Sequence, residues 1–307
     1  QFDSMDSNLI DSNPWSFENT DSKKIIEKLK NQEHPFGEIA EKIAKGSSSG
    51  NDKIFLVDLL QDDNEICLVE SKRGQFKIEK DLLVPFLYGE DVKRLEKCKP
   101  TKFLIYPYHK ENHKLICIDE LKEKYPLALK YFSSVKDELM QRSLKMNNDD
   151  FYKYSALRNA ETYKNRKILI PDILVCGRFG YDNNGLWHNA SIHGVKLKDE
   201  FLYLEKMYLG ILNSSLFWFF IDTTSTALSG DAYRLTPSFV SPFSFPRITE
   251  SNQSTADKII ALVEKILEQK EQDPNSSTQE LESQIDSLVY TLYNLTDEEI
   301  KIIEGKE

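Results

Sequence analysis

Residues 209–246 read LGILNSSLFWFFIDTTSTALSGDAYRLTPSFVSPFSFP, and this stretch is the most informative part of the chain. Across residues 207–221, nearly every position is apolar except one Asn and two Ser residues. A helix that faces water is apolar along one stripe only, so the pattern predicts one helix over 207–221 that is buried on most sides. A polar loop follows, then Tyr233 and Arg234, and then a segment interrupted by prolines. This order predicts a rigid apolar helix that presents a short recognition loop.

The rest of the sequence alternates between helical and strand periodicity, which predicts an α+β fold with a mixed-strand core, flanking helical segments and a C-terminal helical pair. We expect a helical lead-in over 1–52, the core over 53–250 and the C-terminal helical segment over 251–307. Gly46 would stop the second helix and Thr296 would cap the last. The predicted helices are 21–30, 35–45, 126–146, 255–270, 278–293 and 297–303. The predicted strands are 53–60, 65–70, 75–78, 167–176, 187–195 and 201–203, with a hairpin of 103–108 and 114–118.

The charge of the chain is unevenly distributed. The 307 residues include 40 Lys and Arg against 50 Asp and Glu, a net charge of −10 that argues against nucleic-acid binding by the chain as a whole. Residues 94–178, however, contain 18 Lys and Arg against 11 Asp and Glu, interleaved with tyrosines. A basic, aromatic-rich segment predicts a local face for nucleic acid. The alternative is a solvated helical face beside tyrosines of the core.

Cysteine usage and hydropathy bear on the cellular compartment. The four cysteines are widely spaced, no signal-peptide pattern opens the chain, and no apolar run reaches the length of a membrane span. We therefore expect a cytoplasmic protein without a membrane partner. Because the sequence starts QFDSMDSNLIDSNPW, without an initiator Met, we expect a fragment of a longer protein.

Asp58, Glu70 and Lys72 offer the main enzymatic alternative. One large class of nucleases places an Asp about a dozen residues before a Glu-x-Lys strand, where the carboxylates hold a divalent ion and the Lys helps to position or activate water. The spacing in this chain would put Asp58 and Glu70 on neighbouring strands. The pattern is short and often arises by chance, so a charged strand edge is the simpler explanation.

Three further motifs have both a functional and a structural interpretation. His109, His113 and Cys117 could supply zinc ligands from one helix face, but their segment is predicted as a turn and a strand, which favours two exposed histidines and a buried cysteine. Residues 13–15, Asn-Pro-Trp, are similar to the catalytic loop of adenine methyltransferases but lack its second proline and a preceding strand, which favours a turn. Residues 46–50, GSSSG, could cradle a phosphate or simply connect a helix to a strand.

The quoted stretch also resembles a family signature. The pattern LNS-x-L-[FW]-x-[FW], a G-x-x-[YF]-R loop and an aromatic-Pro ending is similar to the TaqI-like C-terminal specificity domain. That domain is the target-recognition part of adenine-N6 DNA methyltransferases and of fused type IIG restriction–modification enzymes. In this chain the loop reads GDAYR where a Gly-Gly pair is usual, and Ser49 stands where Thr is more frequent.

Further segments carry the resemblance across most of the chain, in the order that the family shows. They are Trp15 with the helix after it, IAEKIAKGSSSG (39–50), KIFLV (53–57), LVPFLYGEDVKR (83–94), FLIYP (103–107), KILIP (167–171) and IDSLVYTLYNLTDEEIKII (285–303).

The resemblance implies sequence-specific recognition of double-stranded DNA by a chain that is not an enzyme alone, with no catalytic or metal residues of its own. Methyltransferase or nuclease domains of the same polypeptide would be its partners. S-adenosylmethionine, and Mg²⁺ for cleavage, would be cofactors of the full-length enzyme. Basic residues would contact phosphates, while Tyr233 and Arg234 would read base edges or lie near the flipped base. The candidate DNA-binding residues are Lys45, Gly46, Ser48, Ser49, Gly50, Arg94, Tyr108, Lys153, Arg158, Lys167, Arg178, Gly230, Tyr233 and Arg234.

Two alternatives stay open at this point. Arg234 could instead form a surface ion pair with Asp222 or Asp231, which would contribute little to stability. The chain could also be a protein-interaction module of a restriction–modification complex, with its C-terminal helices binding a partner subunit and DNA handled elsewhere.

Overall fold

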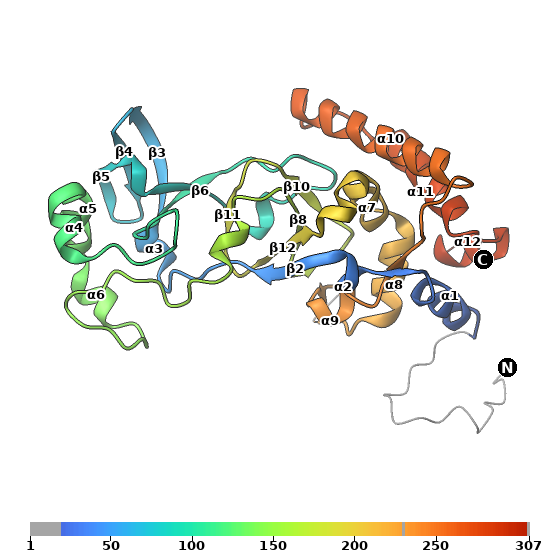
Figure 1. Ribbon diagram of the computed structural model, residues 1–307, viewed down its shortest axis with the longest axis horizontal. Coiled ribbons are helices and arrows are strands. Elements are labelled where there is room, and N and C mark those ends of the chain that lie inside the picture. The colour runs from blue at the N-terminus through green and yellow to red at the C-terminus, as the bar shows by residue number, and fades with distance from the viewer. Residues whose placement is uncertain (1–19, 229–230, 306–307) are drawn as a thin grey trace, which may run out of the picture.

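The computed structural model describes residues 20–228 and 231–305. Figure 1 shows an elongated molecule with a sheet and short helices at one end, a second sheet in the middle and a group of helices at the other end. The Asn-Pro-Trp motif at 13–15 and Gly230 lie outside the described residues. Within the described part, no helix is both long enough and apolar enough to cross a membrane.

The central sheet is antiparallel and has the strand order β10-β8-β12-β2. Alternate residues of its strands face two different cores, as the period of a β-strand requires. Ile168, Ile170 and Val195 pack with the helices, while Leu169 and Ile192 pack under the segment that follows β6. Its strands are β2 (Ala40–Lys45), β8 (Lys167–Pro171), β10 (Gly180–Asp182) and β12 (Ile192–Leu197).

The outer sheet has the order β11-β6-β7-β3-β4-β5, in which β11 runs parallel to β6 and the other pairs are antiparallel. The strands predicted over 65–70 and 75–78 are confirmed, whereas the strand predicted over 53–60 begins only at Leu56, because residues Asp52–Phe55 form a short helix. The outer sheet forms a second core with α5 and the buried tyrosines. The strands are β3 (Leu56–Asp63), β4 (Ile66–Ser71), β5 (Gly74–Glu79), β6 (Leu83–Leu87), β7 (Lys102–Ile105) and β11 (Trp187–His188). The helices at this end are α3 (Asp52–Phe55), α4 (Ile118–Lys124), α5 (Pro126–Ser134) and α6 (Lys136–Met140).

The helical end confirms the predicted first helix and the predicted C-terminal pair. Thr296 caps the last helix by accepting a hydrogen bond from Glu299 N, and the Glu299 side chain bonds back to Thr296 N. This end contains α1 (Thr20–Lys30), α7 (Glu205–Leu212), α8 (Ser215–Thr224), α10 (Gln253–Gln272), α11 (Gln279–Leu292) and α12 (Asp297–Ile303). Short elements nearby are β1 (His34–Pro35), α2 (Phe36–Ile39), β9 (Ile173–Leu174), β13 (Tyr233–Arg234), α9 (Pro237–Val240) and β14 (Ser244–Phe245).

The predicted single helix over 207–221 is wrong, because the chain breaks into α7 and α8 at Asn213 and Ser214. The buried Asn213 amide accepts a hydrogen bond from Phe179 N and donates one to Phe179 O, each at 3.0 Å. Ser214 is the N-cap of α8 and accepts from Phe217 N at 3.3 Å. Polar groups inside a core need partners, and these two find theirs by ending one helix and starting the next.

The predicted helix over 35–45 is wrong beyond Ile39, where it gives way to β2, so Gly46 follows a strand rather than ending a helix. Ala44 pairs with Gly194 and Ile43 pairs with Val195 of β12. Hydrogen bonding to this distant strand overrides the helical spacing of the apolar residues, although Ile43 still packs against the same core.

Three smaller predictions are also corrected. The helix over 126–146 is interrupted at Val135 and ends at Met140, since Val135 has a φ of −115° and a ψ of 12°. The strand predicted over 201–203 is part of a 3₁₀ helix, Asp199–Leu204, held by local bonds such as Phe201 N to Lys198 O. The second half of the predicted hairpin is reduced to one bridge between Tyr108 and Leu115, because α4 begins at Ile118.

Candidate nucleic-acid interface

Four side chains from four separate parts of the chain meet at one edge of the central sheet. Lys45 is the last residue of β2, Asp172 directly follows β8, His193 lies in β12 opposite Lys45, and Arg234 ends β13. Lys45 Nζ lies 2.9 Å from Asp172 Oδ1, and Arg234 Nε lies 3.9 Å from Asp172 Oδ2. His193 Nδ1 lies 3.9 Å from Asp172 Oδ1. We call these four residues the Asp172 cluster.

The Asp172 cluster carries an excess of positive charge on its accessible side. The side chains of Lys45 and Arg234 are 38% and 52% exposed, whereas those of Asp172 and His193 are 15% and 2% exposed. Burial lowers the pKa of His193 to about 4, with Lys45 adding to the effect and Asp172 opposing it, so the imidazole is neutral at pH 7. Two half-exposed cations therefore share one carboxylate.

Arg234 is held at one edge of its guanidinium group. The distance of 3.9 Å from Nε to Asp172 is an ion pair beyond hydrogen-bonding range, and within the described residues no hydrogen bond occupies the two terminal nitrogens. Its partner is therefore Asp172, not Asp222 or Asp231. Asp222 instead accepts a hydrogen bond of 2.5 Å from Tyr233 OH. The terminal nitrogens of Arg234 are free to meet a ligand.

Residues 46–50 form a packed crossing between the two sheets. Ser47 N donates to Tyr163 OH at 2.7 Å, Ser48 N donates to Ala156 O at 2.8 Å, and Ser49 O accepts from Arg142 at 2.7 Å. Ser47 and Ser49 are only 5% and 4% exposed. At least two of the amides that could have cradled a phosphate already have partners, so this segment serves as a connection that positions Lys45.

Gly46 is the tightest point of this crossing. A Cβ at Gly46 would lie 2.0 Å from His188 O and 2.5 Å from Asn189 O, and Asn189 is bridged to Ser47, so these backbone atoms cannot easily move aside. We expect Gly46→Ala to lower the free energy of unfolding by about 1–3 kcal/mol in chemical denaturation. Ser48→Ala, which adds no atoms to the same segment, is the control and should unfold like the wild type. Equal stability of the two variants would contradict the close packing at Gly46.

Several residues that the sequence predicts as DNA contacts interact instead with other residues of the chain. Lys167 is 1% exposed and lies 2.5 Å from the buried carboxylate of Asp182. Tyr108 is 7% exposed, and its hydroxyl accepts from Tyr154 N. Arg94 bonds Glu282 on α11 and the carbonyl of Gly177. We therefore do not retain Lys167, Tyr108 and Arg94 as DNA contacts.

The other predicted residues of the basic segment differ in accessibility. Lys153 pairs with Asp150 at 2.6 Å, three residues earlier. Arg178 donates to Gly89 O at 3.3 Å, and its buried Nε has no partner within the described residues. Arg158 is exposed, and its side chain makes no hydrogen bond or ion pair in the described part of the chain. Arg158 is thus the most available of the three for a phosphate.

Two lysines that were not among the predicted DNA contacts add to the positive charge that Arg158 provides. Lys110 and Lys164 make no side-chain hydrogen bond or ion pair with any described residue, and their charges lie close enough to affect each other. Burial is the main cause that lowers the pKa values of Lys110 and His113, and Lys164 lowers both further. Nearby carboxylates oppose the shift, chiefly Asp81 at Lys110 and Glu161 at His113. The mixture of basic and aromatic residues had indicated that this segment could face nucleic acid. Only the fold shows which of its lysines are paired with other residues and which are not.

The metal-site alternatives find no support in the described residues, which contain no group of three or more His, Cys, Asp or Glu side chains that could hold an ion. Asp58 and Glu70 do face each other on β3 and β4, as predicted, but Lys102 Nζ binds the Asp58 carboxylate at 2.6 and 2.7 Å. His109 pairs with Glu120, while Cys117, predicted to be buried, is exposed at the start of α4.

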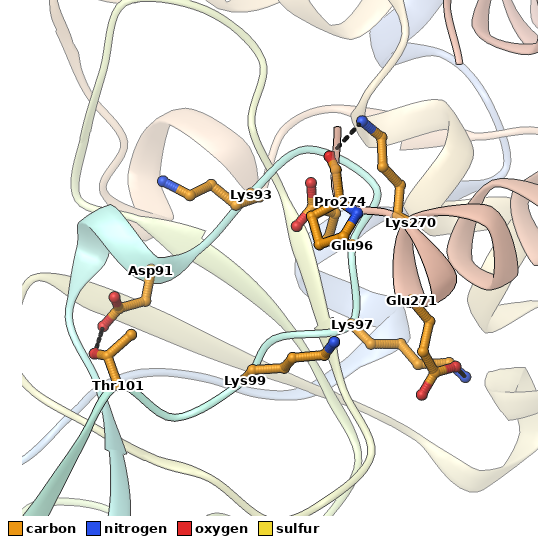
Figure 2. A pocket seen from close by; sticks show the side chains of 9 residues that line it. All are labelled: Asp91, Lys93, Glu96, Lys97, Lys99, Thr101, Lys270, Glu271 and Pro274. Atoms are coloured by element: carbon orange, nitrogen blue, oxygen red, sulfur yellow. Dashed lines mark hydrogen bonds and ion pairs between the residues drawn. The ribbon is translucent and has the colours of Figure 1, made fainter. Parts of the chain in front are cut away.

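A hollow of about 180 Å³ lies between the segment after β6 and the end of α10 (Figure 2). Its lysines are mostly engaged: Lys97 pairs with Glu271 at 2.5 Å, and Lys270 donates to Pro274 O at 3.2 Å. These contacts connect the segment after β6 to the C-terminal helices. The hollow is therefore a place where two parts of the fold meet, and most of its lysines are not free for a ligand. Its lining residues are Asp91, Lys93, Glu96, Lys97, Lys99, Thr101, Lys270, Glu271 and Pro274.

Comparisons with known proteins identify a family, one relative in sequence and one solved structure with the same fold. The TaqI-like C-terminal specificity domain matches residues 84–243, more than half of the chain. The type II methyltransferase M.BstVI of Geobacillus stearothermophilus is 23% identical over 297 residues, covering 95% of this chain and 46% of the relative. The type IIL restriction–modification enzyme MmeI, solved in complex with DNA, has the same fold over 90% of this chain and 36% of its own, with a TM-score of 0.56 and 13% identity. The chain therefore spans less than half the length of either relative.

Proposed function

The chain belongs to the TaqI-like C-terminal specificity domain family, and on that premise we propose that it recognises a sequence in double-stranded DNA for a restriction–modification enzyme. The Asp172 cluster carries this proposal. There the fold brings together Lys45 and Arg234, two sequence-predicted contacts from distant parts of the chain, with their charged ends accessible. Arg234 would read a base edge, since its terminal nitrogens can donate two parallel hydrogen bonds to guanine.

We assign a separate role to the free cations of the basic segment. Arg158, Lys110 and Lys164 would contact phosphates, which fixes the register of the domain on the duplex without reading sequence. Phosphate contacts release bound counterions, so they weaken as salt rises. The acidic remainder of the chain would keep long-range attraction small and make binding depend on these local contacts.

Binding of this chain to a fluorescent mixed-sequence duplex should therefore be weak and strongly salt-dependent. Replacing both Arg158 and Lys164 by Ala should weaken binding to every duplex alike and reduce the slope of log affinity against log salt by roughly 2, about 0.9 for each lost contact. Fluorescence anisotropy over a KCl series measures both quantities. Lys258→Ala, an exposed lysine on α10, is the control and should change neither. An affinity that stays flat across the salt series would refute the phosphate contacts.

We further propose that catalysis belongs to other domains of the same polypeptide. The family description is a specificity domain, and M.BstVI, named a methyltransferase, is about twice as long as the part that matches this chain. S-adenosylmethionine, and Mg²⁺ if the enzyme cleaves, would bind to those domains in the cytoplasm. No contact among the described residues favours a nuclease or a protein-interaction module over this assignment.

A further inference from the structure

We propose that Asp172 determines specificity in the DNA contact: it orients Arg234 toward base edges and repels phosphates from the same cations. The inference rests on the proposed function of the Asp172 cluster and adds a residue that sequence-based prediction missed.

The backbone of Asp172 is fixed on both sides. Its N–H donates to Ser191 O at 2.8 Å, and its carbonyl accepts from Leu235 N at 2.8 Å. Asp172 therefore lies between the chain that enters β12 and the residue that follows Arg234. Beside it, β13 pairs with β9 so that Arg234 lies opposite Ile173. The carboxylate and the base of the Arg234 side chain thus share one rigid frame, which a tether needs if it is to orient a longer side chain.

The carboxylate reaches Arg234 at Nε, the end of the guanidinium nearest the backbone. An ion pair at Nε restrains the direction of the group, and no hydrogen bond within the described residues occupies its terminal nitrogens. The other carboxylate oxygen of Asp172, Oδ1, forms an ion pair with Lys45 Nζ at 2.9 Å that lacks hydrogen-bond geometry. His193 cannot serve as a third cation, because burial keeps it neutral at pH 7. Asp172 thus orients both cations without fully neutralising them.

The charge of Asp172 acts differently on base edges and on phosphates. A guanine edge offers neutral acceptors, N7 and O6, which the terminal nitrogens of Arg234 can bind while the carboxylate stays in place. A phosphate that approached Lys45 or Arg234 would bring a negative charge toward Asp172, whose side chain is 15% exposed. The repulsion weakens contacts that any sequence can make, and specificity depends on such penalties as much as on attraction.

The test compares two duplexes. One is selected from a random pool by this chain, and the other is a scrambled version of it. Asp172→Asn keeps the shape of the side chain and removes its charge. It should raise the affinity for the scrambled duplex roughly tenfold and steepen the salt slope by about 0.9, as one cation becomes free for a phosphate. The affinity for the selected duplex should change much less. The preference for the selected over the scrambled duplex should therefore fall.

Asp172→Glu separates the orientation of Arg234 from the repulsion of phosphates. It also tests the proposal if the Asn variant does not fold. It retains the charge, so the scrambled duplex should still bind weakly, but the longer side chain displaces Arg234 and the preference should fall several-fold. Glu264→Gln on α10, which removes the carboxylate that pairs with Lys206 of α7, controls for net charge and should alter neither affinity. Unchanged binding of the scrambled duplex by Asp172→Asn would overturn the repulsion, and unchanged preference in Asp172→Glu would overturn the tether. A wild-type chain that selects no sequence would instead refute the proposed function itself.

Discussion

Replacing Lys167 with Ala is expected to lower the free energy of unfolding by about 3–5 kcal/mol, the usual cost of removing one partner from a buried ion pair. The side chains of Lys167 and Asp182 are 1% and 0% exposed, so the remaining carboxylate could not recover its hydration. Lys167 Nζ also donates to Tyr163 O at 3.0 Å and to Asn165 O at 3.3 Å. Urea denaturation followed by tryptophan fluorescence measures the loss.

The destabilisation caused by Lys167→Ala should extend to the segment between β10 and β11. Asp182 also accepts hydrogen bonds from Asn184 N at 2.8 Å and Leu186 N at 2.9 Å, so an unpaired carboxylate would disturb that turn as well. Lys153→Ala is the matched control. It breaks a half-exposed pair with Asp150 and should cost no more than about 1 kcal/mol. If both variants unfolded at the wild-type urea concentration, the buried ion pair would not support the fold.

Arg234→Ala is expected to have the largest effect on recognition. Loss of a bidentate contact to guanine costs about 1–3 kcal/mol, so affinity for the selected duplex should fall roughly tenfold or more. Stability should hardly change, because the Arg234 side chain is 52% exposed and its ion pair with Asp172 is long. Anisotropy titrations with the selected and scrambled duplexes, together with a thermal melt, test the two parts separately.

Arg234→Lys is the sharper companion variant. A lysine preserves the charge but offers no planar pair of donors, so the scrambled duplex should bind about as before while the preference for the selected duplex declines. If Arg234→Ala bound the selected duplex with wild-type affinity, β13 would not carry the reading residue. Affinity lost equally for both duplexes would mean that Arg234 contacts a phosphate.

Accurate sequence-based predictions came from segments that local signals define. The helices α10, α11 and α12 were predicted to within about two residues, because apolar spacing and the Thr296 cap act over a single turn. The strands β4 and β5 followed from short alternating runs separated by turns, whereas β3 lies three residues later than predicted. The pattern around Arg234 also indicated an accessible arginine beside a buried helical region, which the structure confirms in outline.

The family, the α+β class and the basic character of the middle segment could all be predicted from the sequence, since these depend on composition and on motifs along the chain. Three findings required the three-dimensional fold: residues 40–45 form a strand, Lys167 is buried, and Asp172 joins Lys45 to Arg234. Each of these depends on a partner far away in sequence: β12 for β2, Asp182 for Lys167, and β13 for Asp172. A charged side chain looks the same in the sequence whether it meets water or a buried counter-charge, and long-range strand pairing determines which of the two it meets.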